Sequence, residues 1–143
     1  MNLSKKSEEC KKILRRYFPN YKSKEEIFAD FAKSYLKKED HLLDVGCGRG
    51  SKIDFTNYIK LAVGIDKIEE NLRENYKVHT RIVGDIEKRI PFSDSTFDIV
   101  ACEMVLEHLK NPLIFFKELS RVLKEKGVFI LMTPNIVFGS LVN

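Results

Sequence analysis

The chain has 143 residues, of which 43% are hydrophobic and 32% charged, which suits one globular domain with a core of its own. The formal net charge is +4, and its basic excess lies in residues 1–40, a pattern more typical of hydrated helix faces than of a nucleic-acid site, so nucleic acid is a less favoured partner. Three widely spaced cysteines, a polar N-terminus and short apolar runs argue against a disulfide framework, a zinc site, a signal peptide and a membrane span, so we expect a cytoplasmic protein.

Residues 1–40 predict a cap of two amphipathic helices. The first carries an apolar stripe of Cys10, Ile13, Leu14, Tyr17 and Phe18 and ends at Pro19. The second begins after Ser23, whose hydroxyl can cap it while Glu26 completes a capping box. Its apolar positions are Ile27, Phe28, Phe31, Ala32, Tyr35 and Leu36. Both stripes are expected to pack against the rest of the domain.

From residue 41, short apolar runs alternate with helical segments. The expected strands are His41–Val45, Leu61–Ile65, Val78–Val83, Phe97–Cys102 and Val128–Met132. The expected helices are Ser51–Tyr58, Ile68–Asn75, Met104–Leu109 and Pro112–Lys124. This alternation predicts an α/β fold with a Rossmann-like, doubly wound, mainly parallel sheet covered on both faces. Ligands of such sheets bind at the carboxyl ends of the strands.

Three glycines, Gly46, Gly48 and Gly50, directly follow the first expected strand. Glycine permits positive φ angles and close backbone approach, and the N–H groups of such a turn can bind a polar or anionic group. The spacing is G-x-G-x-G, with Ser51 where the dinucleotide fingerprint has glycine or alanine. The stretch therefore predicts a nucleotide-type loop.

Carboxylates stand near the ends of the first three strands. Asp44 precedes the glycines, and Asp66 ends the second strand, where it can accept ribose hydroxyls of NAD or of an adenosine ligand equally well. Asp85 follows the third strand, where it can accept from the exocyclic amine of adenine or simply cap the next turn. If the three carboxylates lie in one row, they would contact in turn the amino acid part, the ribose and the base of a bound ligand.

These motifs make residues 41–135 resemble the class I S-adenosylmethionine-dependent methyltransferases, through "LLDVGCGRG", "VGID", "GDIEKRIPFSDSTFDIV", "EMVLEHLKNP" and "FFKELSRVLKEKGVFILMTPN". The resemblance implies strand order 3-2-1-4-5, S-adenosylmethionine as cofactor and S-adenosylhomocysteine as product. It implies in-line methyl transfer to a small-molecule, lipid, quinone or glycan acceptor. The cofactor-binding residues it implies are Asp44, Gly46, Cys47, Gly48, Asp66, Lys67, Asp85, Ile86 and Glu103.

The catalytic residue stays unknown, with Glu103, Glu107 and His108 as candidates for a general base. In quinone-pathway and small-RNA methyltransferases a similar E-x-x-E-H run binds a metal. Here the spacing is E-x-x-x-E-H, which rotates Glu103 by about 100° around a helix. We therefore expect no metal, and His108 remains open between a structural role, acceptor contact and metal binding.

The family sheet has two further strands, 6 and 7, which form a hairpin beyond strand five. We expect one domain, residues 1–143, with a helical cap (1–40), a cofactor-binding core (41–135) and a tail (136–143) too short for that hairpin. Either the chain is a fragment, or the tail and a partner chain, for example in a homodimer, cover the edge of strand five. The alternative functions are a non-catalytic methyltransferase-like binding module and, less favoured, an NAD-dependent enzyme.

Overall fold

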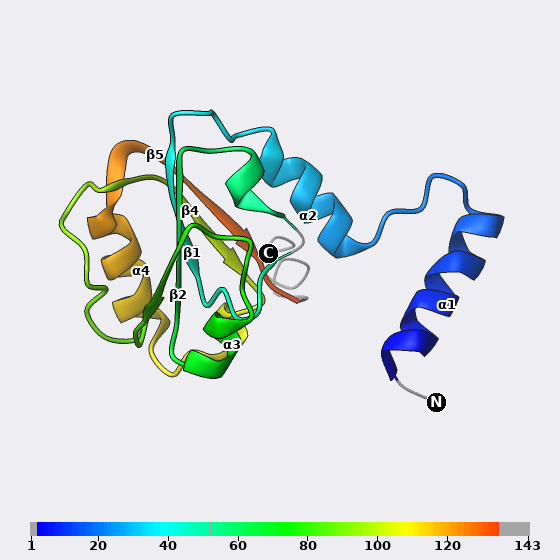
Figure 1. Cartoon of the computed structure of the whole chain (residues 1–143). Helices are drawn as coiled ribbons and strands as arrows, with labels where there is room; N and C mark the ends of the chain where they lie inside the picture. Colours follow the sequence, from blue (N-terminus) through cyan, green and yellow to red (C-terminus); the bar gives the residue numbers. More distant parts are fainter. Residues whose placement is uncertain (1–2, 52, 135–143) are drawn as a thin grey trace, which may run out of the picture.

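The computed structural model describes residues 3–51 and 53–134, built around a five-stranded sheet (Figure 1). The predicted tail, residues 136–143, lies outside the described residues. The strands are β1 (His41–Val45), β2 (Leu61–Asp66), β3 (Thr80–Val83), β4 (Phe97–Glu103) and β5 (Leu123–Met132). All neighbouring pairs are parallel, in the order β3-β2-β1-β4-β5, which confirms the predicted topology. The loops after the strands therefore gather at one edge of the sheet.

The register of these strands sets how deep each strand-end carboxylate lies. Asp44 of β1 stands opposite Gly64 of β2, so Asp66 lies two residues further toward the carboxyl edge. Asp66 stands opposite Val83 of β3, so Asp85 lies two residues further again. The three carboxylates consequently form a graded row, with Asp44 the most deeply placed.

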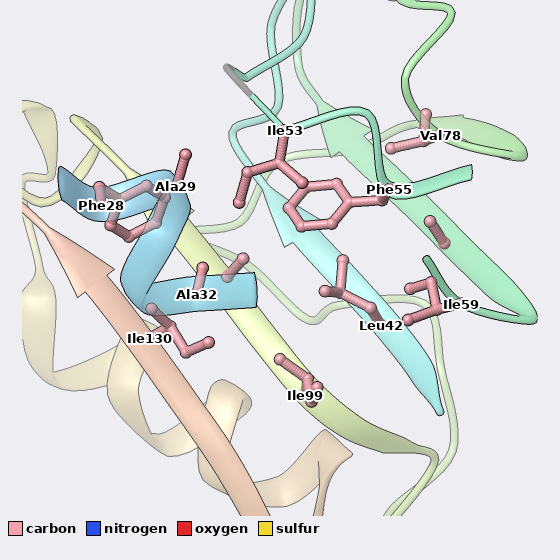
Figure 2. Packing of buried hydrophobic residues seen from close by; sticks show 12 residues of the cluster. Phe28, Ala29, Ala32, Leu42, Ile53, Phe55, Ile59, Val78, Ile99 and Ile130 are labelled. Atoms are coloured by element: carbon pink, nitrogen blue, oxygen red, sulfur yellow. The ribbon is translucent and has the colours of Figure 1, made fainter. Parts of the chain in front are cut away.

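Apolar side chains cover both faces of the sheet. The helices are α1 (Leu3–Tyr17), α2 (Lys24–Lys33), α3 (Glu69–Arg73) and α4 (Pro112–Val122), with two 3-10 turns, η1 (Phe55–Asn57) and η2 (Leu106–His108). Leu42 of β1 belongs to the cluster under α2 and η1, and Leu43 to the cluster under α4. Figure 2 shows the first cluster, with Phe28 and Ala32 of α2 above Ile130 of β5. Because neighbouring residues of β1 are buried on opposite faces, the strand is buried continuously over 42–45 rather than at alternate positions.

The predicted capping box of α2 is confirmed. Ser23 Oγ accepts from the N–H of Glu26 at 3.3 Å, and the Glu26 carboxylate accepts from the N–H of Ser23 at 2.8 Å. This reciprocal pair satisfies two backbone donors that the first turn of a helix leaves without partners. It fixes where α2 starts, at the edge of the sheet that carries the glycine loop.

The expectation that both N-terminal apolar stripes are buried is wrong for α1 and for one side of α2. Tyr17 and Phe18 are exposed, and α1 lies away from the sheet in Figure 1. On α2, Phe28, Ala29 and Ala32 are buried, whereas Ile27 and Phe31 are exposed. Tyr35, just beyond the end of α2, is exposed as well. A helix on a flat sheet buries only the side chains that point at it. None of the described helices combines the length and apolar character that a membrane span requires.

Two expected helices are replaced by short turns. Among the described residues of 51–58 only η1 forms, because Asp54 Oδ1 accepts from the Thr56 N–H and Ser51 Oγ from the Ile53 N–H, which favours turns over a helix. Within 104–109 only η2 forms, after Met104 adopts a φ of 57° that an α-helix cannot contain.

The remaining differences are at element ends. The third helix spans five residues of the expected eight, β3 begins two residues later than expected, and α4 ends two residues earlier. β5 begins five residues earlier, at Leu123, but its register shifts before Val128. The predicted run Val128–Met132 is therefore the regularly paired part of that strand.

Candidate functional site

The glycine loop turns sharply at the end of β1. Gly46 and Gly48 have φ angles of +65° and +47°, in the left-handed region that favours glycine. A Cβ on Gly46 would lie 2.4 Å from Val105 Cγ2, whereas a Cβ on Gly48 would meet no atom within 4 Å. The N–H groups of Gly46 and Cys47 both donate to Ile65 O of β2, at 2.8 and 3.2 Å. The loop is thereby pinned to the neighbouring strand while its Gly48 side faces open space.

A buried amide fastens the outer part of this loop. Asn75, which is fully buried, donates through Nδ2 to Cys47 O at 3.3 Å and to Gly48 O at 3.2 Å. Its Oδ1 accepts from the N–H of Lys77 at 3.0 Å. One side chain therefore binds two loop carbonyls and one N–H, and Cys47 O also accepts from the Gly50 N–H at 2.9 Å.

Two adjoining cavities open along the carboxyl edge of the sheet. The first, of about 360 Å³, is lined by Gly46, Asp66, Lys67, Ile68, Gly84, Asp85, Ile86, Glu87, Met104, Val105, His108 and Leu109. The second, of about 380 Å³, is lined by Glu25, Asp44, Gly46, Cys47, Gly48, Arg49, Gly50, Ser51, Lys77, Glu103 and Met104. They share Gly46 and Met104 and so form one continuous site. All nine sequence-predicted cofactor residues line it: each cavity has five of them, and Gly46 belongs to both.

Three carboxylates line the first cavity, and two of them, Asp66 and Asp85, are held by backbone N–H groups; the third is Glu87. Asp66 accepts from Gly48 N at 3.0 Å and from Ile68 N at 2.8 Å, one bond at each oxygen. Asp85 accepts from Glu87 N at 3.0 Å, so it does cap the following turn while it lines the cavity. Each carboxylate oxygen can accept more than one hydrogen bond, so both side chains keep acceptor capacity toward the cavity.

Asp44 is the unusual group of the second cavity. Its side chain is 2% exposed, and among the described residues its Oδ2 has no hydrogen-bond partner. Burial, with the neighbouring charges of Glu103 and Asp66, raises the pKa of Asp44 to about 8. A buried carboxyl oxygen without a partner is costly, and a cationic hydrogen-bond donor in the cavity would relieve that cost.

Comparison with known proteins gives this arrangement a family. A family model described as a methyltransferase domain matches residues 43–131. The chain belongs to this methyltransferase family. It is 35% identical over 118 residues to an uncharacterized methyltransferase of Schizosaccharomyces pombe, covering 71% of this chain and 42% of that protein. It is 36% identical over 131 residues to an uncharacterized protein of Methanocaldococcus jannaschii, covering 82% and 56%.

A solved structure supports the same fold for the methyltransferase domain. The YcgJ protein of Bacillus subtilis superposes with a TM-score of 0.65 at 25% identity, covering 71% of this chain and 48% of YcgJ. The chain thus spans about half the length of the curated relatives it matches. The matched part contains the glycine loop and the three strand-end carboxylates.

The three candidate catalytic residues of the methyltransferase domain do not converge. Glu103, the last residue of β4, lines the second cavity, and His108 lines the first. Glu107 lines neither and accepts instead from Thr133 Oγ1 at 3.1 Å. Between Glu103 and η2 the backbone passes through the positive φ of Met104, so the three residues do not follow one another on a single helix. The described part of the chain holds no group of three or more His, Cys, Asp or Glu side chains placed to bind a metal.

The thiols of the methyltransferase domain are poor nucleophiles where they are buried. Burial, followed by neighbouring carboxylates, raises the pKa of Cys47 and of Cys102 to about 12. Both remain protonated near neutral pH, so Cys47 contributes its surface to the cavity rather than a reactive thiolate.

Several residues of the site were missed by the sequence analysis. Glu25, on the first turn of α2, lines the second cavity from 20 residues upstream of the glycine loop, and the sequence marks it only as part of a helix start. Met104 joins both cavities through its positive φ, which no local pattern indicates. Asn75 holds the glycine loop through hydrogen bonds to residues 27 and 28 positions earlier in the chain, a separation that local patterns do not cover.

Proposed function

We propose that this chain binds S-adenosylmethionine along the two adjoining cavities and forms the donor-binding part of an enzyme that transfers its methyl group, leaving S-adenosylhomocysteine. The observation that carries this proposal is Asp44, a buried carboxyl without a partner at Oδ2 among the described residues. It lines the second cavity, beside a first cavity lined by Asp66, Asp85 and Glu87. Such a site fits a ligand that is cationic at one end and rich in hydroxyl and amine donors at the other.

The residues present fit that ligand. At the second cavity, Asp44 and Glu103 would hold the amino group and face the sulfonium, and Gly46, Cys47 and Gly48 would border the methionine part. At the first cavity, Asp66 would accept from the ribose hydroxyls. The residues proposed to border the ribose and adenine there are Lys67, Asp85 and Ile86. In the domain so defined, residues 41–135 bind the cofactor, 1–40 form the cap and 136–143 the tail.

The chemistry asks the protein chiefly for alignment. When bound, the sulfonium supplies an electrophilic methyl group whose positive charge disperses as the transfer proceeds. A rigid glycine loop and fixed strand ends hold donor and acceptor in line. Such alignment can lower the activation barrier by several kcal/mol. An acceptor that keeps its proton also needs a general base, for which Glu103 and His108 stand at the cavities and Glu107 outside them.

A small-molecule, lipid, quinone or glycan acceptor is part of this proposal, and nucleic acid is less favoured. A second candidate function, a binding module without turnover, is favoured by the separation of Glu103, Glu107 and His108. The chain also spans about half of its relatives, so the activity of the whole protein is itself a proposal.

Titration calorimetry tests the proposal. S-adenosylmethionine and S-adenosylhomocysteine should bind and NAD should not, and Asp66→Ala should weaken binding at least tenfold. Asp30→Ala is the matched control, because Asp30 is exposed on α2 and forms its ion pair with Lys22 at the surface. Binding of NAD, or silence with both methyl-donor ligands, contradicts the proposal. Binding without methyl transfer to any acceptor class would favour the module.

A further inference from the structure

α1 and α2 each carry an apolar stripe that the sheet does not cover. On α1, Ile13 is 54% and Tyr17 71% exposed, and on α2, Ile27 is 57% and Phe31 54% exposed. Amphipathic helices gain stability mainly by burying such a stripe. Because both consecutive helices leave an apolar stripe exposed, each could cover the stripe of the other.

The spacing of the two stripes matches an antiparallel pair. Suppose that Tyr17 lies beside Ile27. Ile13 is four residues before Tyr17 and Phe31 is four residues after Ile27, so these two also lie side by side. Three further residues in each direction place Cys10 beside Ser34. Equal steps correspond because both helices rise by the same length per residue. The connection 18–23 is six residues long, within the range usual between packed neighbouring helices.

Charge favours the same pairing. The described side chains of α1 include Lys11, Lys12, Arg15 and Arg16 against Glu8 and Glu9, and α2 carries Glu25, Glu26 and Asp30 against Lys24 and Lys33. One contact already joins them, the ion pair between Arg15 and Glu26. A basic helix and an acidic helix attract each other when they lie side by side.

We propose that α1 folds onto α2 as an antiparallel helical hairpin, with Ile13 and Tyr17 packed against Phe31 and Ile27. The C-terminal end of α1 then lies next to the first turn of α2, where Glu25 lines the second cavity. The hairpin would thus place Tyr17 near the rim of that cavity.

Oxidative crosslinking of the full chain tests this register with a native thiol. Ser34→Cys puts a second thiol opposite the exposed Cys10, whereas Lys33→Cys puts it one residue away, turned by about 100° around the helix and off the apolar stripe. Cys47 and Cys102 are buried and do not compete. We expect a disulfide within one chain, found by peptide mass spectrometry, to form at least tenfold faster in Ser34→Cys than in Lys33→Cys, at a rate independent of protein concentration. A bismaleimide that spans a wider gap should show the same preference.

Each other outcome overturns the hairpin. Equal rates in the two variants, or no crosslink with either reagent, would show that α1 does not dock in this register. A crosslink between chains whose rate rises with concentration would show that the stripe of α2 takes α1 from a second copy. Circular dichroism of the reduced variants confirms that both are folded, so a negative result counts against the proposal.

Discussion

Replacing Asp44 by asparagine should change how the free protein's stability depends on pH. The pKa of Asp44 in the folded protein is raised from 3.8 to about 8, first by burial and then by Glu103 and Asp66. Between these values the folded protein keeps a proton that the unfolded chain has lost. The unfolded state then binds fewer protons, so the free energy of unfolding falls as pH rises, by up to about 1.4 kcal/mol per pH unit. Asparagine cannot ionise and removes this dependence.

The size of the effect follows from the same shift. The whole interval from 3.8 to about 8 sets an upper limit of about 6 kcal/mol on the unfolding free energy that ionisation of Asp44 can remove. Asp44 lines a cavity that water can enter, which screens the charge and reduces that cost. We expect Asp44→Asn to gain about 1–3 kcal/mol of unfolding free energy relative to the original chain between pH 5 and pH 8.

Urea unfolding without ligand at pH 5, 6, 7 and 8 measures the difference between the two proteins. Asp30→Asn is the control: the hydrogen bond and charge of Lys22 lower the pKa of this exposed carboxyl, and Lys33 acts in the same direction. Its stabilising contribution is lost only as pH falls below the ordinary value, so its difference from the original chain should be flat over this range. An equally flat difference for Asp44→Asn would refute our account of the buried carboxyl.

Three further predictions concern the loop and the ligand. Gly46→Ala should lower the unfolding free energy measured in urea by at least about 2 kcal/mol and weaken S-adenosylmethionine binding more than tenfold, because its Cβ would lie 2.4 Å from Val105 Cγ2. Gly48→Ala is strained at a φ of +47° but meets no neighbouring atom, so it should lower the unfolding free energy by about half as much. Asn75→Ala should lower the unfolding free energy by about 1–3 kcal/mol because Gly48 O loses the amide donor and the Lys77 N–H loses its acceptor, while Cys47 O keeps the Gly50 N–H, and a smaller loss would mean that water replaces the amide. Binding of S-adenosylmethionine at pH 7 should release up to one proton from Asp44, since an ammonium group beside it lowers its pKa from about 8; calorimetry in two buffers of different ionisation enthalpy should detect this release in the original chain, and its persistence in Asp44→Asn would assign the proton elsewhere.

The elements that sequence predicted well are those whose signal is local. The apolar runs gave all five strands, the Ser23 and Glu26 pair gave the start of α2, and the glycines gave the loop after β1. Each of these depends on residues within a few positions, where spacing decides the backbone conformation. The two failed helices, at 51–58 and 104–109, were lost to side-chain hydrogen bonds and a positive φ that apolar spacing does not reveal.

The sequence by itself determined that Asp44, Asp66 and Asp85 stand at the ends of neighbouring parallel strands. Only the tertiary structure decided that they differ: Asp44 is buried with a raised pKa, while Asp66 and Asp85 are partly exposed and bound by backbone N–H groups. Strand register and the segments packed above each carboxylate set that difference. Desolvation and charge interactions sum over all neighbours in space, most of which are far away in the chain, so no local pattern can report them.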